Sequence, residues 1–242
     1  MMNLVELAEK YENISFYDED PSQFLLRYKD LKNIETSSFL AAMLAFGNRK
    51  QFIPKLKEIF QLANKTSGNF ADWILGDAKN FPTGQKKFYR FYSYDDLHIF
   101  FQELADILKK NETFGEYLKN LYEKNKNLHL ADIISQCFPK SKIVPKGKNS
   151  ANKRIHMFLR WMVRTNSPVD LGIWTWYSPA DLIIPLDVHV LQESIKLGLL
   201  SENSKPTKKT AIELTNKMKI FFPNDPTKAD FALFGLGVDE NK

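Results

Sequence analysis

The chain has 242 residues, of which 43% are hydrophobic, enough for one large domain or two smaller ones with a substantial core. A single cysteine, Cys137, excludes an intrachain disulfide framework and any multi-cysteine metal or iron–sulfur site. The formal net charge of +5 is by itself weak support for a polyanionic partner.

No apolar segment approaches the roughly 20 residues that cross a bilayer. The first six residues include Glu6 and lack the basic region of a signal peptide. We therefore expect a cytoplasmic protein without a membrane partner.

Apolar residues recur at helical spacing over most of the chain, whereas the alternation typical of strands is almost absent. In the first quarter, Asp20-Pro21 is a typical cap and first turn. Thr36 or Ser37 is expected to begin a helix that ends at Gly47. The 19 Phe and 9 Tyr residues indicate a core filled largely by aromatic rings.

The clearest predicted helix begins near Asp95 and extends to Leu108, and two further apolar stripes cover residues 114–121 and 130–137. Residues 51–138 contain no pattern from which a chemical role can be argued. We interpret them as core scaffold.

The charge distribution between Pro139 and Thr165 is uneven. This segment has no Asp or Glu and contains eight basic residues: Lys140, Lys142, Lys146, Lys148, Lys153, Arg154, Arg160 and Arg164. A carboxylate-free stretch of this length favours a polyanionic partner such as nucleic acid. The alternative is a solvated basic loop without a partner.

Residues 150–164 are predicted to form a helix with one core face and, opposite it, a cationic stripe of Lys153, Arg160 and Arg164. Asn149 or Ser150 is the predicted N-cap, which places Lys153 in the first turn. A cation there lies at the positive end of the helix dipole, which favours the neutral amine. The two arginines are expected to pair either with phosphates or with internal carboxylates.

Asp187 is predicted to cap a helix that extends through Leu197 and ends at Gly198. Two interpretations remain open at this position. The aspartate is either only a helix cap or a partly buried carboxylate held beside a cleft.

The run Pro185-Leu186-Asp187-Val188-His189 closely resembles the proline-x-aspartate-x-histidine run of helix-hairpin-helix DNA glycosylases, in which the aspartate is catalytic. The basic segment before Lys153 resembles the hairpin before the lysine nucleophile of bifunctional members. The separation of 34 residues between Lys153 and Asp187 is similar to that in the archaeal 8-oxoguanine glycosylase branch. Residues 158–164 and 231–238 resemble signatures of an uncharacterised bacterial family related to these enzymes.

The resemblance implies an all-α, two-lobed helix-hairpin-helix DNA glycosylase-like fold. Its central lobe would contain residues 36–186, including the hairpin, and its second lobe would combine residues 1–35 and 187–242. The chain departs from the family in its hairpin, Val144-Pro145-Lys146-Gly147-Lys148, which has one glycine where the usual hairpin has two. This leaves fewer backbone amides that can approach a phosphate closely.

The site residues that the resemblance implies fall into three groups. Lys153 and Asp187 would be catalytic. Six residues would contact DNA: Lys146, Gly147, Lys148, Arg154, Arg160 and Arg164. The rings that could hold a flipped base are those of Trp174, Trp176 and Tyr177. Core packing is the alternative role of these three rings.

The first functional hypothesis is a DNA base-excision glycosylase, with or without AP lyase activity, that acts on an oxidised purine such as 8-oxoguanine in double-stranded DNA. Asp187 would stabilise the oxocarbenium-like transition state, and a neutral Lys153 would attack C1′ to form a Schiff base. No metal, cofactor or obligate protein partner is expected. The alternatives are a non-catalytic DNA- or RNA-binding protein with the same fold, and a helical interaction protein whose basic loop is incidental.

Overall fold

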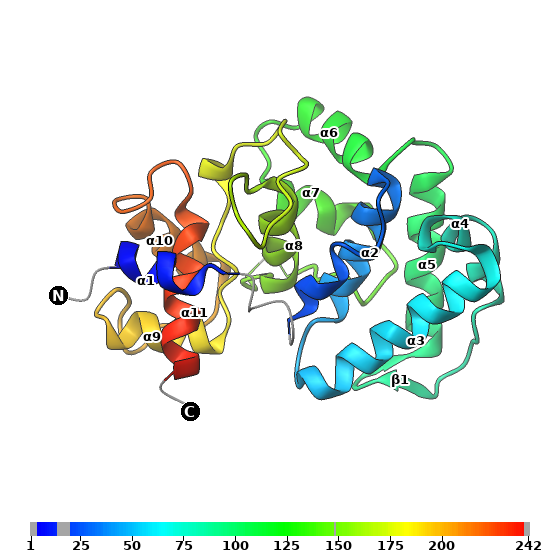
Figure 1. Ribbon diagram of the computed structural model, residues 1–242, viewed down its shortest axis with the longest axis horizontal. Coiled ribbons are helices and arrows are strands. Elements are labelled where there is room, and N and C mark those ends of the chain that lie inside the picture. The colour runs from blue at the N-terminus through cyan, green and yellow to red at the C-terminus, as the bar shows by residue number, and fades with distance from the viewer. Residues whose placement is uncertain (1–3, 14–19, 148, 240–242) are drawn as a thin grey trace. The chain divides into compact units, whose positions relative to one another are not determined.

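The computed structural model describes residues 4–13, 20–147 and 149–239, which form two compact units. The central unit contains residues 19–145, and the terminal unit combines residues 1–18 with 146–242. The described residues are mostly helical, with one two-stranded sheet, as Figure 1 shows. The expected all-α class is therefore confirmed. None of the helices in the described ranges is long and apolar enough to cross a membrane.

Within its described residues, the central unit contains eight helical or 3-10 elements and a β-hairpin. In chain order these are η2 (Pro21–Phe24), α2 (Leu31–Leu44), α3 (Arg49–Ser67), α4 (Phe70–Leu75), η3 (Asp77–Asn80), β1 (Lys87–Tyr89), β2 (Tyr92–Ser93), α5 (Tyr94–Leu108), α6 (Phe114–Lys124) and α7 (Leu130–Cys137). The α2 helix is buried along most of its length. Aromatic rings pack around it: Phe39 lies 4.9–5.8 Å, between centroids, from the rings of Phe100, Phe114 and Phe138. The predicted aromatic core is confirmed in this unit.

Two local predictions in the central unit have different outcomes. The helix expected near Asp95 is α5, whose N-terminus has a capping box between Ser93 and Asp96. The helix expected to begin at Thr36 or Ser37 begins at Leu31, because Asp30 caps it by accepting a hydrogen bond from the Asn33 amide at 2.9 Å. That prediction of the start was wrong.

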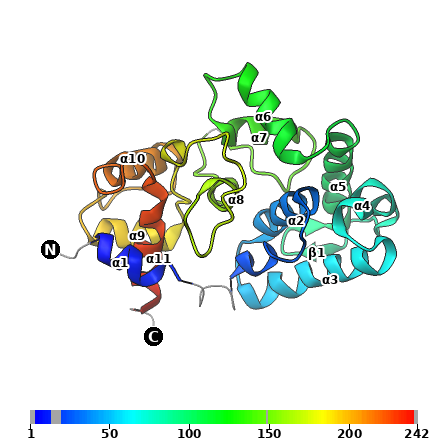
Figure 2. The ribbon, with the colours of Figure 1, turned by 45° about the horizontal axis from the view of Figure 1, so that its top comes forward.

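The terminal unit joins the two ends of the chain. Its elements are α1 (Leu4–Tyr11), α8 (Lys153–Val163), η4 (Pro179–Asp181), α9 (Val188–Lys196), α10 (Lys208–Met218), η5 (Pro226–Lys228) and α11 (Ala229–Asp239). The α1 and α11 helices lie side by side in Figure 1 and Figure 2. Gly235 on α11 permits this close approach, because a Cβ atom there would overlap the ring of Tyr11.

The boundary between the units differs from the predicted one. Residues 146–186, expected in the central lobe, belong to the terminal unit, and residues 19–35 belong to the central unit. The reason is the pairing of α8 with the chain ends: Arg160 contacts Asp230, and Arg164 contacts Glu12 and Asp225. Buried charges need such partners, and these partners are distant in sequence.

Candidate functional site

The side chains of Lys153 and Asp187 meet in the terminal unit. The Nζ atom of Lys153 lies 3.3 Å from Oδ2 of Asp187, and the two side chains are 35% and 21% exposed. Lys153 is the first residue of α8, so it lies in the first turn as predicted. Asp187 is the N-cap of α9, and its Oδ1 accepts a hydrogen bond from the Val190 amide at 2.9 Å. One carboxylate oxygen therefore caps a helix while the other faces the amine.

The start of α8 is set by contacts that the sequence did not reveal. Its N-cap is Asn152, not Asn149 or Ser150, so that prediction was wrong. Ser150 instead forms an isolated β-bridge with Thr207, and the Asn149 carbonyl accepts a hydrogen bond from the Lys208 amide at 2.8 Å. Residues 149–150 therefore pair with residues 207–208, and Asn152 is the residue that precedes the first turn of α8.

Asn152 itself has an unusual conformation. Its backbone lies in the left-handed region, with φ 46° and ψ 39°, and its side chain makes no capping hydrogen bond to α8. Asparagine is one of the few residues other than glycine that adopt this conformation readily. The first-turn amides of α8 therefore have no side-chain cap from Asn152 and remain suited to an anion.

The predicted DNA-contacting residues around positions 146–154 are exposed or half-buried where the structure describes them. Lys146 and Gly147 are exposed, and Arg154 is half-buried on the first turn of α8. Lys148 lies outside the described residues. A Cβ atom at Gly147 would lie 2.7 Å from the Ser150 Cβ, so a side chain at position 147 would crowd this turn.

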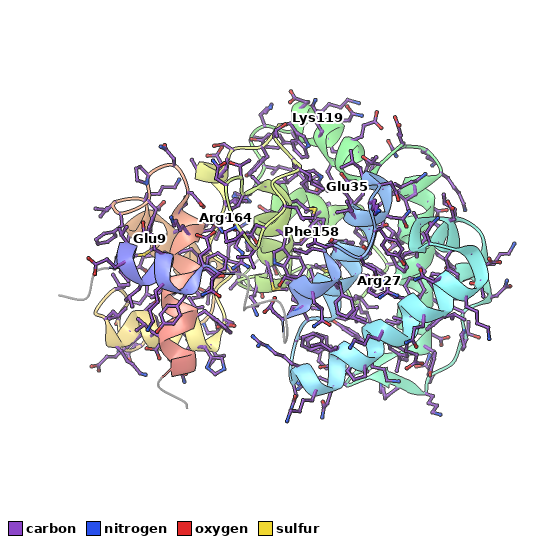
Figure 3. The ribbon with its side chains drawn as sticks, in the orientation of Figure 1. Glu9, Arg27, Glu35, Lys119, Phe158 and Arg164 are labelled. Atoms are coloured by element: carbon purple, nitrogen blue, oxygen red, sulfur yellow. The ribbon has the colours of Figure 1, made fainter. Side chains whose placement is uncertain are left out.

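Arg160 and Arg164 do not form an exposed cationic stripe, and their predicted contact with DNA was wrong. Both are buried, and Figure 3 labels Arg164 at the end of α8. The guanidinium of Arg164 contacts Asp170 at 2.5 Å, Asp225 at 2.7 Å and Glu12 at 2.9 Å.

Arg160 contacts Asp230 and, at 3.4 Å, Asp170. Both guanidinium groups also lie over the ring of Phe231. Of the two alternatives for these arginines, pairing with internal carboxylates is the one observed. Periodicity placed both residues on one helix face correctly, but it does not distinguish a solvated face from one covered by carboxylates.

Four carboxylates surround these two buried arginines, and burial together with the neighbouring charges shifts two pKa values. Burial alone would lower the pKa of Arg164, but Asp170, Asp225 and Glu12 raise it above its ordinary value. Burial raises the pKa of Asp230 from 3.8 to about 6; Arg160 acts against this rise, and Asp187 adds to it. The Lys153–Asp187 pair is thus electrostatically coupled to the buried carboxylates.

Asp170 and Asp230 are the site residues that sequence reasoning missed. In the sequence, Asp230 stands directly before residues 231–238, which resemble a family signature. That resemblance does not indicate that Asp230 pairs with a residue of α8.

Two of the three predicted pocket rings are core residues. Trp174 and Tyr177 are buried, and the Trp174 ring packs edge-on against Phe158 at 5.3 Å. Core packing, the alternative role, is therefore observed for these two rings. The Trp176 ring stacks on the Trp174 ring with centroids 5.4 Å apart, and Trp176 is half-buried. Of the three rings, Trp176 therefore remains the candidate for contact with a base.

A separate cavity of about 300 Å³ lies in the central unit, between α5, α6 and the end of α7. It includes Cys137 and Tyr117 but none of the predicted site residues. Burial raises the pKa of Cys137 to about 11 and that of Tyr117 to about 12, so neither group is an anionic nucleophile at neutral pH.

In the described part of the chain, no group of three or more His, Cys, Asp or Glu residues is arranged to hold a metal ion.

Residues 20–239 match the family described as a protein of unknown function (DUF2400), and the chain belongs to this family. Comparison with curated proteins and with solved structures found no significant match.

Proposed function

We propose that this member of the DUF2400 family is a DNA base-excision glycosylase with AP lyase activity, acting on an oxidised purine such as 8-oxoguanine. The observation that carries the proposal is the 3.3 Å separation of Lys153 Nζ from Asp187 Oδ2, with both side chains accessible to solvent. The resemblance of residues 185–189 to the glycosylase run supports the same roles for these two residues.

The pair can perform the two steps that such a reaction needs. As the bond between C1′ and the base breaks, its electron pair leaves with the base, and Asp187 stabilises the positive charge that develops on the sugar. The unprotonated Lys153 amine then bonds to C1′. The C1′–O4′ bond breaks with its electron pair going to O4′, which takes up the proton released from the nitrogen, and the resulting Schiff base permits β-elimination of the 3′ phosphate. The amine and carboxylate are close enough for Asp187 to orient the amine or accept a proton from it, directly or through one water.

The proposed DNA contacts are the described residues of the basic segment near Lys153 that are exposed or half-buried. Lys146, Gly147 and Arg154 lie within a few residues of Lys153, next to the uncapped first turn of α8. Backbone amides at a helix start and nearby cations are suited to phosphate binding. Lys148 belongs to the same proposal on the basis of the sequence, whereas Arg160 and Arg164 are buried and do not belong to it.

Borohydride trapping tests the proposal. The full-length protein is incubated with duplexes containing 8-oxoguanine or an abasic site, and reduction should produce a covalent protein–DNA adduct. Lys153→Ala should abolish the adduct. The matched control is Lys146→Ala, which removes an exposed lysine from the same segment and should only weaken DNA binding.

An adduct that persists in Lys153→Ala would overturn the assignment of the nucleophile. Base release without an adduct, lost in Asp187→Asn, would indicate a monofunctional glycosylase. No base release from any duplex of the panel would contradict the enzymatic proposal.

One observation favours a second candidate, a nucleic-acid-binding protein without excision activity. Asp187 caps α9 and pairs with Lys153, and this is a complete structural role that needs no substrate. For such a protein, Asp187→Asn should leave the affinity for duplex DNA unchanged, and the wild type should release no base.

A further inference from the structure

The hairpin of the central unit holds an exposed aromatic ring at its tip. Arg90 and Phe91 join β1 to β2, and the Phe91 side chain is 57% exposed. The rings of Phe46 and Tyr92 pack against the Phe91 ring, with centroids 5.2 and 4.6 Å from it. Arg90 has a φ of 49°, an unfavourable value for a residue other than glycine. The turn thus places a bulky aromatic side chain in solvent next to a residue in the left-handed backbone region.

The loop after α2 packs against this hairpin. The Tyr89 hydroxyl donates a hydrogen bond to the Phe46 carbonyl, and the Arg90 guanidinium lies 5.6 Å above the Phe46 ring. Gly47 has a φ of 78°, and a Cβ atom there would overlap the side chains of Arg90 and Tyr89. We call Phe46, Arg90 and Phe91 the hairpin surface. The hairpin runs beside α3 in Figure 1 and Figure 2.

The two segments that form the hairpin surface are basic. Residues 46–57 and 80–94 contain no Asp or Glu, and they contain seven cations: Arg49, Lys50, Lys55, Lys57, Lys86, Lys87 and Arg90. Two of these cations pair with carboxylates from outside the segments, Arg49 with Asp20 at 3.5 Å and Lys55 with Glu58 at 2.8 Å. The excess of positive charge favours a polyanionic partner.

We propose that the hairpin surface binds nucleic acid, with Phe91 stacking on an unpaired base while Arg90 and the neighbouring lysines contact phosphates. Proteins that bind single strands combine a cationic track with aromatic side chains on which bases stack. An anionic membrane would also attract the cations, but it requires several apolar side chains for insertion. Within residues 46–57 and 80–94, all of which are described, Phe91 is the only exposed large apolar side chain. Nucleic acid is therefore the better match.

This inference goes beyond the proposed function, since Lys153 and Asp187 belong to the other unit. Its test uses the full-length protein and an undamaged, fluorescein-labelled single-stranded oligonucleotide. In anisotropy titrations, Phe91→Ala should weaken binding by about 5- to 150-fold, as expected when one base no longer stacks. Phe91→Trp should retain the affinity. The matched control is Phe221→Ala, which removes a 47% exposed ring from the terminal unit and should leave the affinity unchanged.

Two further measurements test base stacking and phosphate contacts separately. A 2-aminopurine base in the oligonucleotide should lose fluorescence on binding to the wild type but not to Phe91→Ala, because stacking quenches it. The double variant Lys50→Gln/Lys86→Gln should flatten the salt dependence of binding, by about 0.7 in the slope of log K against log salt for each phosphate that the protein no longer neutralises.

Equal affinities of the wild type and Phe91→Ala would overturn the inference. So would binding to phosphatidylserine vesicles without binding to the oligonucleotide, which would identify a membrane surface instead. Lys153→Ala should retain the Phe91-dependent affinity. A negative result in the trapping experiment therefore does not contradict nucleic-acid binding by the hairpin surface. A negative result in the Phe91 titrations likewise does not contradict the proposed role of Lys153.

Discussion

At the residue scale, the terminal unit buries several charged side chains, whereas most proteins keep such side chains at the surface. Two buried arginines are held by four carboxylates, and the Lys153–Asp187 pair is coupled to this cluster through Asp230. Replacing one member of a buried charge cluster leaves its partners unpaired, which usually costs about 3–5 kcal/mol. Such a cluster holds α8 in one position, and with it the amine at the start of that helix.

Asp230 should make the stability of the protein depend on pH. Its pKa in the folded protein, about 6, is above the ordinary value of 3.8, so the folded state binds this proton more tightly than the unfolded chain does. The resulting stability is fully present below about pH 4 and is lost as the pH rises through 6. Asp230→Asn removes this titration, worth roughly 3 kcal/mol between pH 4 and pH 7.

Urea unfolding of the wild type and Asp230→Asn at a series of pH values measures this effect. The free energy of unfolding of the wild type should fall relative to that of the variant as the pH rises. Parallel profiles would show that Asp230 keeps its ordinary affinity for protons in the folded state.

At the element scale, the proposed catalytic carboxylate also caps a helix, so its two roles must be separated. One oxygen of Asp187 accepts the Val190 amide at the start of α9, and the other faces Lys153. Asparagine keeps a side-chain oxygen for the cap but loses the charge, whereas alanine loses both.

We expect Asp187→Ala to lower the free energy of unfolding by about 1 kcal/mol, the usual effect of losing an N-cap. Asp187→Asn should lower it less, because the partly exposed pair with Lys153 contributes at most about 1 kcal/mol. Both values come from denaturant unfolding. If Asp187→Asn is as stable as the wild type and still inactive in base release, the charge of Asp187 is needed for the reaction. Equal destabilisation by both substitutions would mean that the cap contributes nothing measurable.

At the scale of the whole molecule, the terminal unit is assembled from segments at opposite ends of the sequence. The α1 helix supplies Tyr11, which packs on Gly235, and it is followed by Glu12, which pairs with Arg164. A short N-terminal segment thus completes both the apolar packing and the charge pairing of this unit.

Removal of residues 1–13 should therefore destabilise the terminal unit more than the central one. Hydrogen exchange followed by mass spectrometry should show a larger loss of protection in α8 and α11 than in α5. The double substitution Tyr11→Ala/Glu12→Gln should reproduce much of the effect with the full chain length retained. Equal changes in α5, α8 and α11 would contradict the division of the chain into these units.

Local sequence signals determined several features of this protein. The helical class, the capping box of α5, the position of Lys153 in a first turn and the capping of α9 by Asp187 all depend on hydrogen bonds and periodicities within a few residues. Only the tertiary structure decided the environment of the arginines, the boundary between the units and the N-cap of α8. These depend on partners far along the chain: Arg164 pairs with a residue 152 positions away and Arg160 with one 70 positions away. Burial and charge pairing are consequences of which surfaces meet, and a helical period does not contain that information.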